Sequence, residues 1–152
     1  MQIFERLAAN GFREMPGAAD FVRLMAERFP GRMALVTSSP VRFVLPFLEH
    51  YQLSEYFSPH LIISEETMLA QGLKGKPAPD PYKFAMKRLH AKRLLTFEDV
   101  VPGVMSAKKA GVTVIALGFD APNAQLFEAG GLAYPPDAYV KSYAEARQLL
   151  NL

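Results

Sequence analysis

The sequence predicts an α/β fold built on a parallel sheet, and three observations support this. Short apolar runs of the kind found in buried parallel strands occur at residues 33–37, 61–63 and 112–117. Segments with apolar residues at helical spacing lie between these runs. Proline or hydroxyl residues mark where several of the helices begin, and glycines mark where they end. Strands that alternate with helices in this way form parallel sheets.

The first half of the chain is expected to form five elements. They are a short helix over residues 2–10, a helix over 18–29, a strand over 33–37, a helix that begins at Ser39 and Pro40, and a strand over 61–63. Phe21, Met25 and Phe29 recur at helical spacing in the second of these.

The second half continues the alternation. Its expected elements are a helix opened by Asp80 and Pro81, an apolar stretch that turns acidic over 94–99, a helix from Pro102 to Gly111, a strand over 112–117, a helix from Pro122 to Gly130, a strand over 138–140 and a final helix. Ser142 and Glu145 have the spacing of a capping box for that final helix.

Composition excludes several classes of protein. The 152 residues fit one domain, and 50% of them are hydrophobic, which is enough for a core. A net charge of +2 gives no broad basic surface, so we expect no nucleic-acid partner. No apolar run approaches the roughly 18 residues of a membrane span, so we expect no membrane association. The chain has no cysteine, which is compatible with a reducing, cytoplasmic location.

Polar residues follow two of the predicted strands, where parallel sheets bind ligands. Thr37 and Ser38 come after one strand and directly before a helix, and Glu98 and Asp99 come after another. Hydroxyls and free helix N–H groups bind phosphate oxygens. Lys76 would supply a compact positive charge, and carboxylates are the ligands that Mg²⁺ prefers. Together these residues predict a site for phosphate and magnesium.

The stretch LKGKPAPDPY holds Lys76 on an unusually stiff backbone. Proline fixes its own φ and restricts the residue before it, so this lysine suits a fixed anion. Each motif also has a structural explanation, as a helix cap, a turn or an acidic first helical turn. Their occurrence together favours a functional site. The glycine-rich phosphate loops of nucleotide-binding proteins are absent.

Three segments, ALVTSSP, KGKPAPDPY and FEDVVPGVMSAKKAGV, resemble the haloacid dehalogenase superfamily, in the branch of β-phosphoglucomutase and phosphoglycolate phosphatase. The resemblance implies a Rossmann-like three-layer parallel sheet. It also implies that Thr37 and Ser38 bind the transferring phosphoryl group and that Lys76 neutralises both phosphate and nucleophile. Asp99 would be a Mg²⁺ ligand, and Glu98 would bind the metal directly or support a ligand.

The resemblance fails at the start of the chain. Family members begin with a strand that ends in Asp-x-Asp, whose first aspartate attacks phosphorus. Here the only aspartate before Thr37 is Asp20, which lies in the predicted helix 18–29 and has no aspartate two residues later. We therefore expect an N-terminally incomplete core over 13–152, with residues 1–12 as the end of a helical cap.

Three functions remain open on this basis. The first is a Mg²⁺-dependent phosphatase or phosphomutase for a small phosphorylated metabolite, inactive alone because it lacks its own nucleophile. The second is a phosphate-binding module without catalysis, and the third is an interaction domain. In the family, the absent strand lies between the strands that end at Thr37 and Phe97. Unpaired edges attract strands, so we expect self-association or a second chain that supplies the strand.

Overall fold

The computed structural model describes residues 14–118 and 121–152. Its helices are α2 (Ala18–Arg28), α3 (Val41–His50), α4 (Glu65–Ala70), α5 (Asp80–Arg88), α6 (Val101–Lys109), α7 (Ala121–Ala129) and α8 (Tyr143–Leu150). Its strands are β1 (Leu35–Val36), β2 (Ile62–Ile63), β3 (Leu95–Glu98), β4 (Thr113–Leu117) and β5 (Ala138–Val140). Two short 3-10 turns, Ser54–Tyr56 and Pro59–Leu61, precede β2. The alternation of helix and strand confirms the α/β class.

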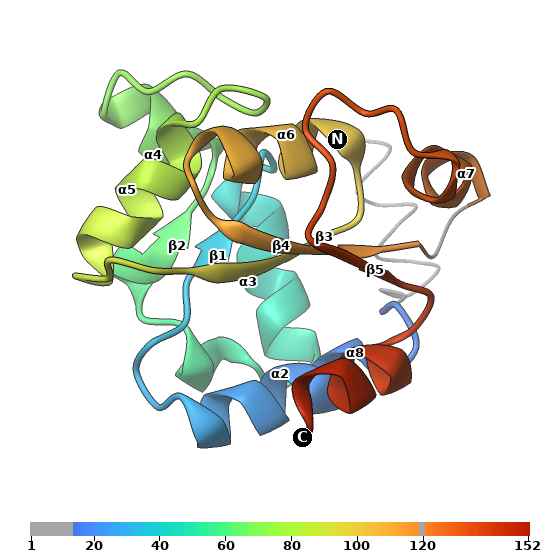
Figure 1. Ribbon diagram of the computed structural model, residues 1–152. Helices are drawn as coiled ribbons and strands as arrows, with labels where there is room; N and C mark the ends of the chain where they lie inside the picture. The colour runs from blue at the N-terminus through green and yellow to red at the C-terminus, as the bar shows by residue number, and fades with distance from the viewer. Residues whose placement is uncertain (1–13, 119–120) are drawn as a thin grey trace, which may run out of the picture.

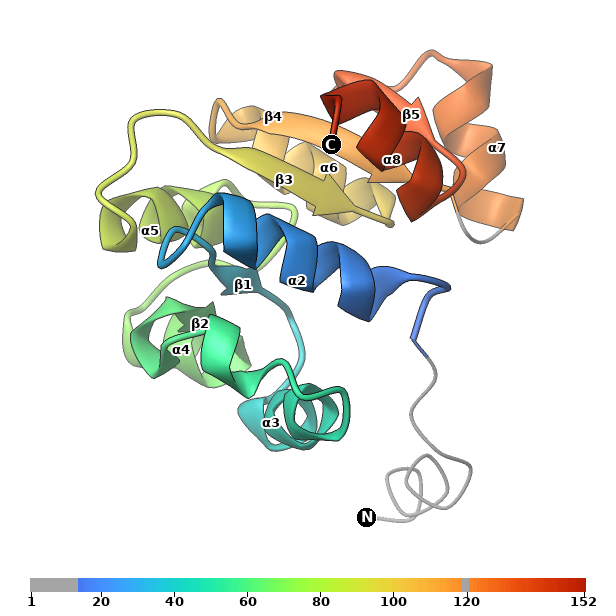
Figure 2. The same ribbon diagram turned by 90° about the horizontal axis from the view of Figure 1, so that it is seen from below.

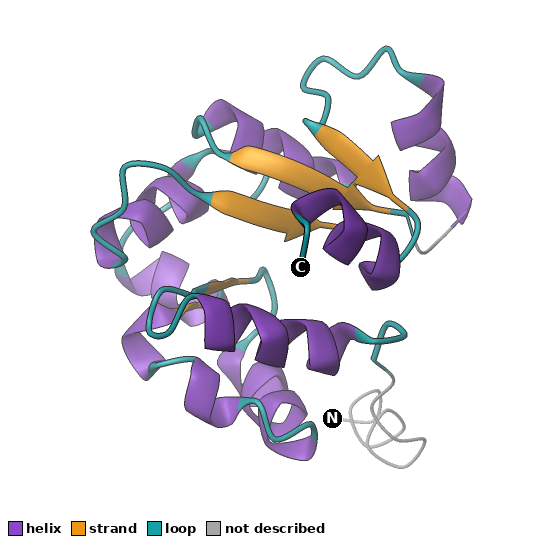
Figure 3. Cartoon of the chain, turned by 60° about the horizontal axis from the view of Figure 1, so that its bottom comes forward, coloured by secondary structure: helices purple, strands orange, loops and turns teal. Residues whose placement is uncertain are grey.

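The described strands form two parallel sheets (Figure 3). In the smaller sheet β1 pairs with β2, and in the larger one β3, β4 and β5 pair in that order. Every pair is parallel, as the sequence predicts. Within the described residues, no strand pairing joins β1 to β3, so the single sheet expected from the sequence is divided.

Helices cover both faces of the larger sheet (Figure 1). On one face Val104 and Ala107 of α6 and Phe127 of α7 pack against β4 in a core that also includes Tyr82 of α5. On the other face α2 and α8 pack over Ile115, Leu117 and Val140. This is the three-layer arrangement that the sequence resemblance implies.

Helix α2 lies across the boundary between the two sheets (Figure 2). Its Phe21 belongs to the core of the larger sheet, where its ring centroid is 5.0 Å from that of Phe97. Its Ala19 belongs to a separate core formed with Val44 and Leu48 of α3. The helix therefore joins two bodies that share no strand pairing among the described residues.

Several boundaries differ from the prediction. The expected strand 33–37 is shorter in the structure and corresponds to β1. Strand β3 ends at Glu98, so Asp99, at the acidic end of the stretch 94–99, lies outside the strand. The capping box is confirmed in its first half, because Ser142 Oγ accepts a hydrogen bond of 3.1 Å from the Glu145 N–H. The expected helix 2–10 and the cap segment 1–12 lie outside the described residues. No helix in the described part is long and apolar enough to cross a membrane.

Candidate functional site

The side chain of Lys76 lies where the ends of β1 and β3 approach each other. Its Nζ donates a hydrogen bond of 3.1 Å to the backbone carbonyl of Val36 in β1 and another to the carboxylate of Glu98 in β3. The ammonium also lies 5.4 Å from the centroid of the Tyr82 ring. The lysine is mostly buried, so its charge has a fixed position between the two sheets.

The carboxylate of Glu98 points inward. It accepts hydrogen bonds from Lys76 Nζ and from the hydroxyl of Tyr82, and its side chain is only 5% exposed. Burial, and then the neighbouring Glu98 charge, raise the pKa of Tyr82 above its usual range, so the hydroxyl stays a donor. Glu98 also lies against Gly103 in the first turn of α6, where a Cβ atom would come within 2.0 Å of Oε2.

The proline loop that carries Lys76 is fixed at both ends. The carboxylate of Asp80 accepts a hydrogen bond of 3.0 Å from the Lys74 N–H. Ser106 Oγ of α6 donates a hydrogen bond of 2.5 Å to the carbonyl of Ala78. Side chains of α5 and α6 therefore hold the backbone on either side of Lys76, in addition to the restriction that the prolines impose.

Thr37 and Ser38 follow β1 at its carboxyl end. The Thr37 N–H donates to the carbonyl of Ile63 at 2.9 Å, and Thr37 Oγ1 accepts a hydrogen bond of 3.0 Å from the Ser39 N–H. Ser38 is exposed. The two hydroxyls thus flank a turn that leads into α3 and lie next in sequence to the carbonyl that Lys76 binds.

Glu66 has a role at this turn that its sequence position does not reveal. The sequence indicates only an acid in the first turn of α4. In the structure its carboxylate accepts a hydrogen bond of 2.8 Å from the Val41 N–H and another of 2.8 Å from Ser64 Oγ. These contacts lower the pKa of Glu66, chiefly through the Val41 N–H. Glu66 therefore fixes the start of α3 beside Thr37.

Asp99 is exposed directly after β3, while its neighbour Glu98 is buried. Burial, followed by the charges of Asp99 and then Glu14, raises the pKa of Tyr143 to about 12. Among residues 14–118 and 121–152, no three His, Asp or Glu side chains are grouped as a metal cluster. Asp99 offers an exposed carboxylate at this end of the sheet, the kind of ligand that Mg²⁺ takes together with water and phosphate.

Asp20 does not belong to this site. It is exposed on α2 and forms an ion pair of 2.9 Å with Arg23 of the same helix. Its helical position agrees with the sequence prediction and gives no support for a nucleophile.

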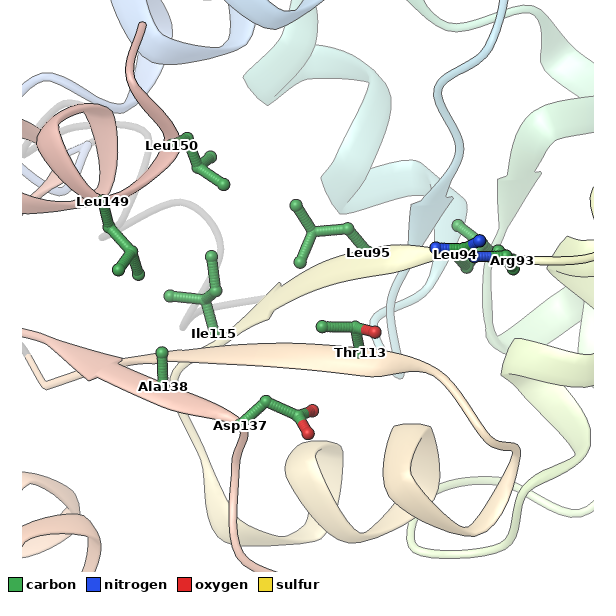
Figure 4. Close-up of a pocket in the computed structure, with 9 residues that line it drawn as sticks. All are labelled: Arg93, Leu94, Leu95, Thr113, Ile115, Asp137, Ala138, Leu149 and Leu150. Atoms are coloured by element: carbon green, nitrogen blue, oxygen red, sulfur yellow. The ribbon is translucent and has the colours of Figure 1, made fainter.

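A cavity of about 410 Å³ lies elsewhere in the fold (Figure 4). Leu95, Ile115 and Leu150 line its apolar part, and Arg93 and Asp137 lie at its border. These residues come from the amino ends of β3, β4 and β5 and from the end of α8. The cavity is therefore at the opposite end of the strands from Thr37 and Asp99 and carries none of the candidate chemistry.

Comparison with known proteins identifies the lineage. Residues 3–111 match the family model of haloacid dehalogenase-like hydrolases. The chain is 35% identical over 106 residues to phosphoglycolate phosphatase 1 of Pseudomonas aeruginosa, and this alignment covers 68% of this chain and 36% of that protein. It is 29% identical over 110 residues to the phosphorylated carbohydrates phosphatase of Thermotoga maritima, and this alignment covers 71% of this chain and 48% of that protein.

Solved structures agree with this lineage. A haloacid dehalogenase family hydrolase from Deinococcus radiodurans, solved with bound phosphate and sodium, matches with a TM-score of 0.70 and 29% identity over 90% of this chain and 58% of that one. A putative β-phosphoglucomutase from Bacteroides vulgatus has a TM-score of 0.71 and 22% identity over 93% of this chain and 55% of that one, which supports the fold.

The chain spans only 36% to 48% of the length of the two phosphatases compared above. The family model nevertheless covers well over half of this chain, and the fold agrees with it. The chain belongs to the haloacid dehalogenase-like hydrolases.

Proposed function

We propose that the chain provides the phosphate-binding and Mg²⁺-binding part of a phosphatase or phosphomutase site for a small phosphorylated metabolite. The observation that supports this most directly is the placement of Lys76, whose ammonium lies between the Val36 carbonyl and the Glu98 carboxylate. A solvated lysine would gain nothing from such confinement. A lysine that neutralises an anion at a fixed place requires it.

Each residue at this end of the strands has a role in the proposal. The hydroxyls of Thr37 and Ser38 donate hydrogen bonds to phosphate oxygens, and the positive charge of Lys76 offsets the negative charge of the phosphate. Asp99 holds Mg²⁺, which would supply further positive charge to the phosphoryl group. Glu98 acts as the counterion of Lys76 rather than as a metal ligand, because its carboxylate already accepts bonds from the lysine and from Tyr82.

Covalent phosphoryl transfer also needs a carboxylate in line with the leaving group. Asp20 pairs with Arg23 on the surface of α2. The proposal therefore assigns the nucleophile to a segment outside residues 1–152. Without that segment the chain binds phosphate and does not turn it over, so a non-catalytic phosphate-binding module is the second candidate.

Titration calorimetry with inorganic phosphate in the presence of Mg²⁺ tests the binding site. We expect Lys76→Met to weaken phosphate binding at least about tenfold, which corresponds to about 1.4 kcal/mol. Lys74→Met is the matched control, because Lys74 is exposed in the same loop and its removal changes net charge equally. Circular dichroism would verify that both variants fold. Equal affinities of the two variants, or no phosphate binding by the wild type, would contradict the proposal.

A further inference from the structure

One segment of the chain concentrates positive charge. Residues 83–93, KFAMKRLHAKR, hold five of the 17 Lys and Arg residues and none of the 15 Asp and Glu residues. Removing the +5 of this segment from the net charge of +2 leaves −3 for all other residues. The near-neutral total therefore combines one strongly positive segment with a negative remainder. Such an asymmetry is typical of a surface that attracts an anionic partner.

The five charges of residues 83–93, which we call the basic segment, face solvent without acidic partners. They belong to Lys83, Lys87, Arg88, Lys92 and Arg93, on α5 and on the link from α5 to β3. All except Arg88 are exposed, and the guanidinium of Arg88 lies 4.8 Å from the centroid of the Phe84 ring. Within residues 14–118 and 121–152, none of the five forms an ion pair with a carboxylate.

Helix stability explains only part of this charge. Lys87 and Arg88 occupy the last turn of α5, where cations interact favourably with the helix dipole. Lys83, however, is exposed four residues before Lys87, and like charges at that spacing destabilise a helix. Lys92 and Arg93 come after the end of the helix. A bound anion would offset the repulsion that these three additional cations create.

The basic segment ends at the border of the cavity at the amino ends of β3, β4 and β5 (Figure 4). The volume of about 410 Å³ is within the range of ligand sites, so an apolar side chain of a partner fits inside. Leu149 remains 49% exposed, so part of the apolar lining is accessible from solvent. That lining consists of Leu94, Leu95, Ile115, Ala138, Leu149 and Leu150.

Of the two charged residues at the cavity, only Arg93 is left unpaired among the described residues. Asp137 Oδ1 accepts a hydrogen bond of 2.7 Å from Lys108 Nζ, and Oδ2 accepts one of 2.8 Å from the Val114 N–H. The cavity therefore lacks the several converging polar groups that orient a small ligand. An occupant that places an apolar side chain in the cavity and acidic groups on the basic segment satisfies both features.

We propose that the basic segment and the adjoining cavity form a docking site for an acidic segment of another polypeptide, which inserts an apolar side chain into the cavity. Complementary charge speeds the encounter and fixes the orientation, and a buried apolar anchor contributes much of the affinity. The site is at the opposite end of the strands from Thr37 and Asp99, so the inference does not depend on the phosphate chemistry proposed for those residues.

Two other anionic partners match the surface less well. A single-stranded nucleic acid supplies negative charge, but it binds largely by stacking its bases on aromatic side chains, and the lining of this cavity is aliphatic. An anionic membrane attracts clusters of Lys and Arg, but it is bound by an amphipathic helix that buries its own apolar face in the lipid. Here the apolar surface adjoining the basic segment is a cavity.

Fluorescence anisotropy with labelled peptides and the whole chain tests the docking. The probe has a central pair of leucines with a short run of aspartates on each side, and its control has alanines in place of the leucines. We expect the leucine probe to bind at least about tenfold more tightly than the alanine probe. Raising the salt concentration from about 0.05 M to about 0.5 M should weaken both, because it screens the exposed charges.

A pair of charge variants locates the acidic contact. Lys92→Gln combined with Arg93→Gln should weaken binding of both probes at least about tenfold, because it removes two cations next to the cavity. The matched control combines Arg42→Gln with Lys74→Gln, which removes the same charge from exposed positions at the other end of the strands. The control should change affinity less than about twofold. Circular dichroism verifies that both variants fold.

A cavity variant tests the anchor separately from the charge. Ala138 lines the cavity, so Ala138→Leu fills part of its volume (Figure 4). We expect this variant to bind the alanine probe as the wild type does and to lose the preference for the leucine probe. If circular dichroism shows that Ala138→Leu does not fold, the comparison of the two probes on the wild type decides the point.

Several outcomes would overturn the proposal. The first is no saturable binding of the leucine probe up to about 1 mM, which would mean affinity no better than millimolar. The second is equal affinity for the two probes, and the third is equal weakening by the charge variant and its control. Tighter binding of single-stranded DNA or of phosphatidylserine vesicles, lost in the Lys92 and Arg93 variant, would assign the surface to a nucleic acid or to a membrane instead.

Discussion

The contact between Glu98 and Gly103 predicts a large effect from adding one methyl group. Gly103 lies within α6 at an ordinary helical φ, so alanine meets no backbone strain there. Its Cβ would, however, lie 2.0 Å from Glu98 Oε2 and 2.3 Å from Cδ. Real Cβ atoms do not approach so closely, and the carboxylate has to move away from Lys76 and Tyr82.

The size of the effect follows from three contributions. Overpacking of a well-packed site costs about 1–3 kcal/mol. Disrupting the bonds of a buried carboxylate costs about 1–3 kcal/mol more. Alanine regains about 1 kcal/mol because it favours the helix. We expect Gly103→Ala to lower the free energy of unfolding by about 3 kcal/mol, which is roughly 6–12 °C in melting temperature for a chain of this size.

Urea and thermal unfolding followed by circular dichroism measure this change. Gly75→Ala is the matched control, because Gly75 has an ordinary φ and no atom within 4 Å of the place that an alanine Cβ would occupy, and its effect should stay within about 1 kcal/mol. In a Glu98→Ala background, Gly103→Ala should be neutral or stabilising, because the obstructing carboxylate is gone. A loss below about 0.5 kcal/mol in the wild-type background would refute the reasoning.

Two further predictions concern alkaline stability and turnover. The pKa of Tyr143 is raised to about 12, so the folded state holds the proton more tightly than the unfolded state does. Stability should therefore fall as pH rises from about 10 to 12, with a slope of up to about 1.4 kcal/mol per pH unit from this group, and Tyr143→Phe should make the fall shallower in pH-dependent urea unfolding. With Mg²⁺ and para-nitrophenyl phosphate, the chain should release no nitrophenol above the uncatalysed rate; robust release that Asp99→Ala abolishes would show that the nucleophile is within this chain.

The sequence predicts the fold well where periodicity and turn residues agree. The strand 138–140 and the helix capped by Ser142 appear as expected, because their apolar spacing and end signals coincide. The strand 33–37 is shorter than its apolar run suggests. Parallel strands are defined by their partners, and among the residues that the structure describes β1 pairs on one edge only. An apolar run therefore indicates that a strand is suited to burial, but it does not determine how many of its residues pair with a neighbouring strand.

At the site, the sequence identifies the types of residue better than it identifies where their side chains point. It predicts that Lys76, Thr37 and the acidic pair lie at one end of the strands. It does not distinguish Glu98 from Asp99, although one is buried against Gly103 and the other is exposed. A glycine five residues after a glutamate is the only local sign of that contact. Glu66 could not be identified in advance, because its partner Val41 is 25 residues away in the chain.

The double contact of Lys76 has a thermodynamic consequence. A single ammonium group holds a backbone carbonyl of β1 and a carboxylate of β3. An ammonium group has three N–H donors, so an anion can accept the third while the bonds to Val36 and Glu98 stay in place. An anion bound there would favour the arrangement in which β1 and β3 both contact the lysine. Anion binding and the contact between the two sheets would therefore be linked, and each would strengthen the other by the same factor.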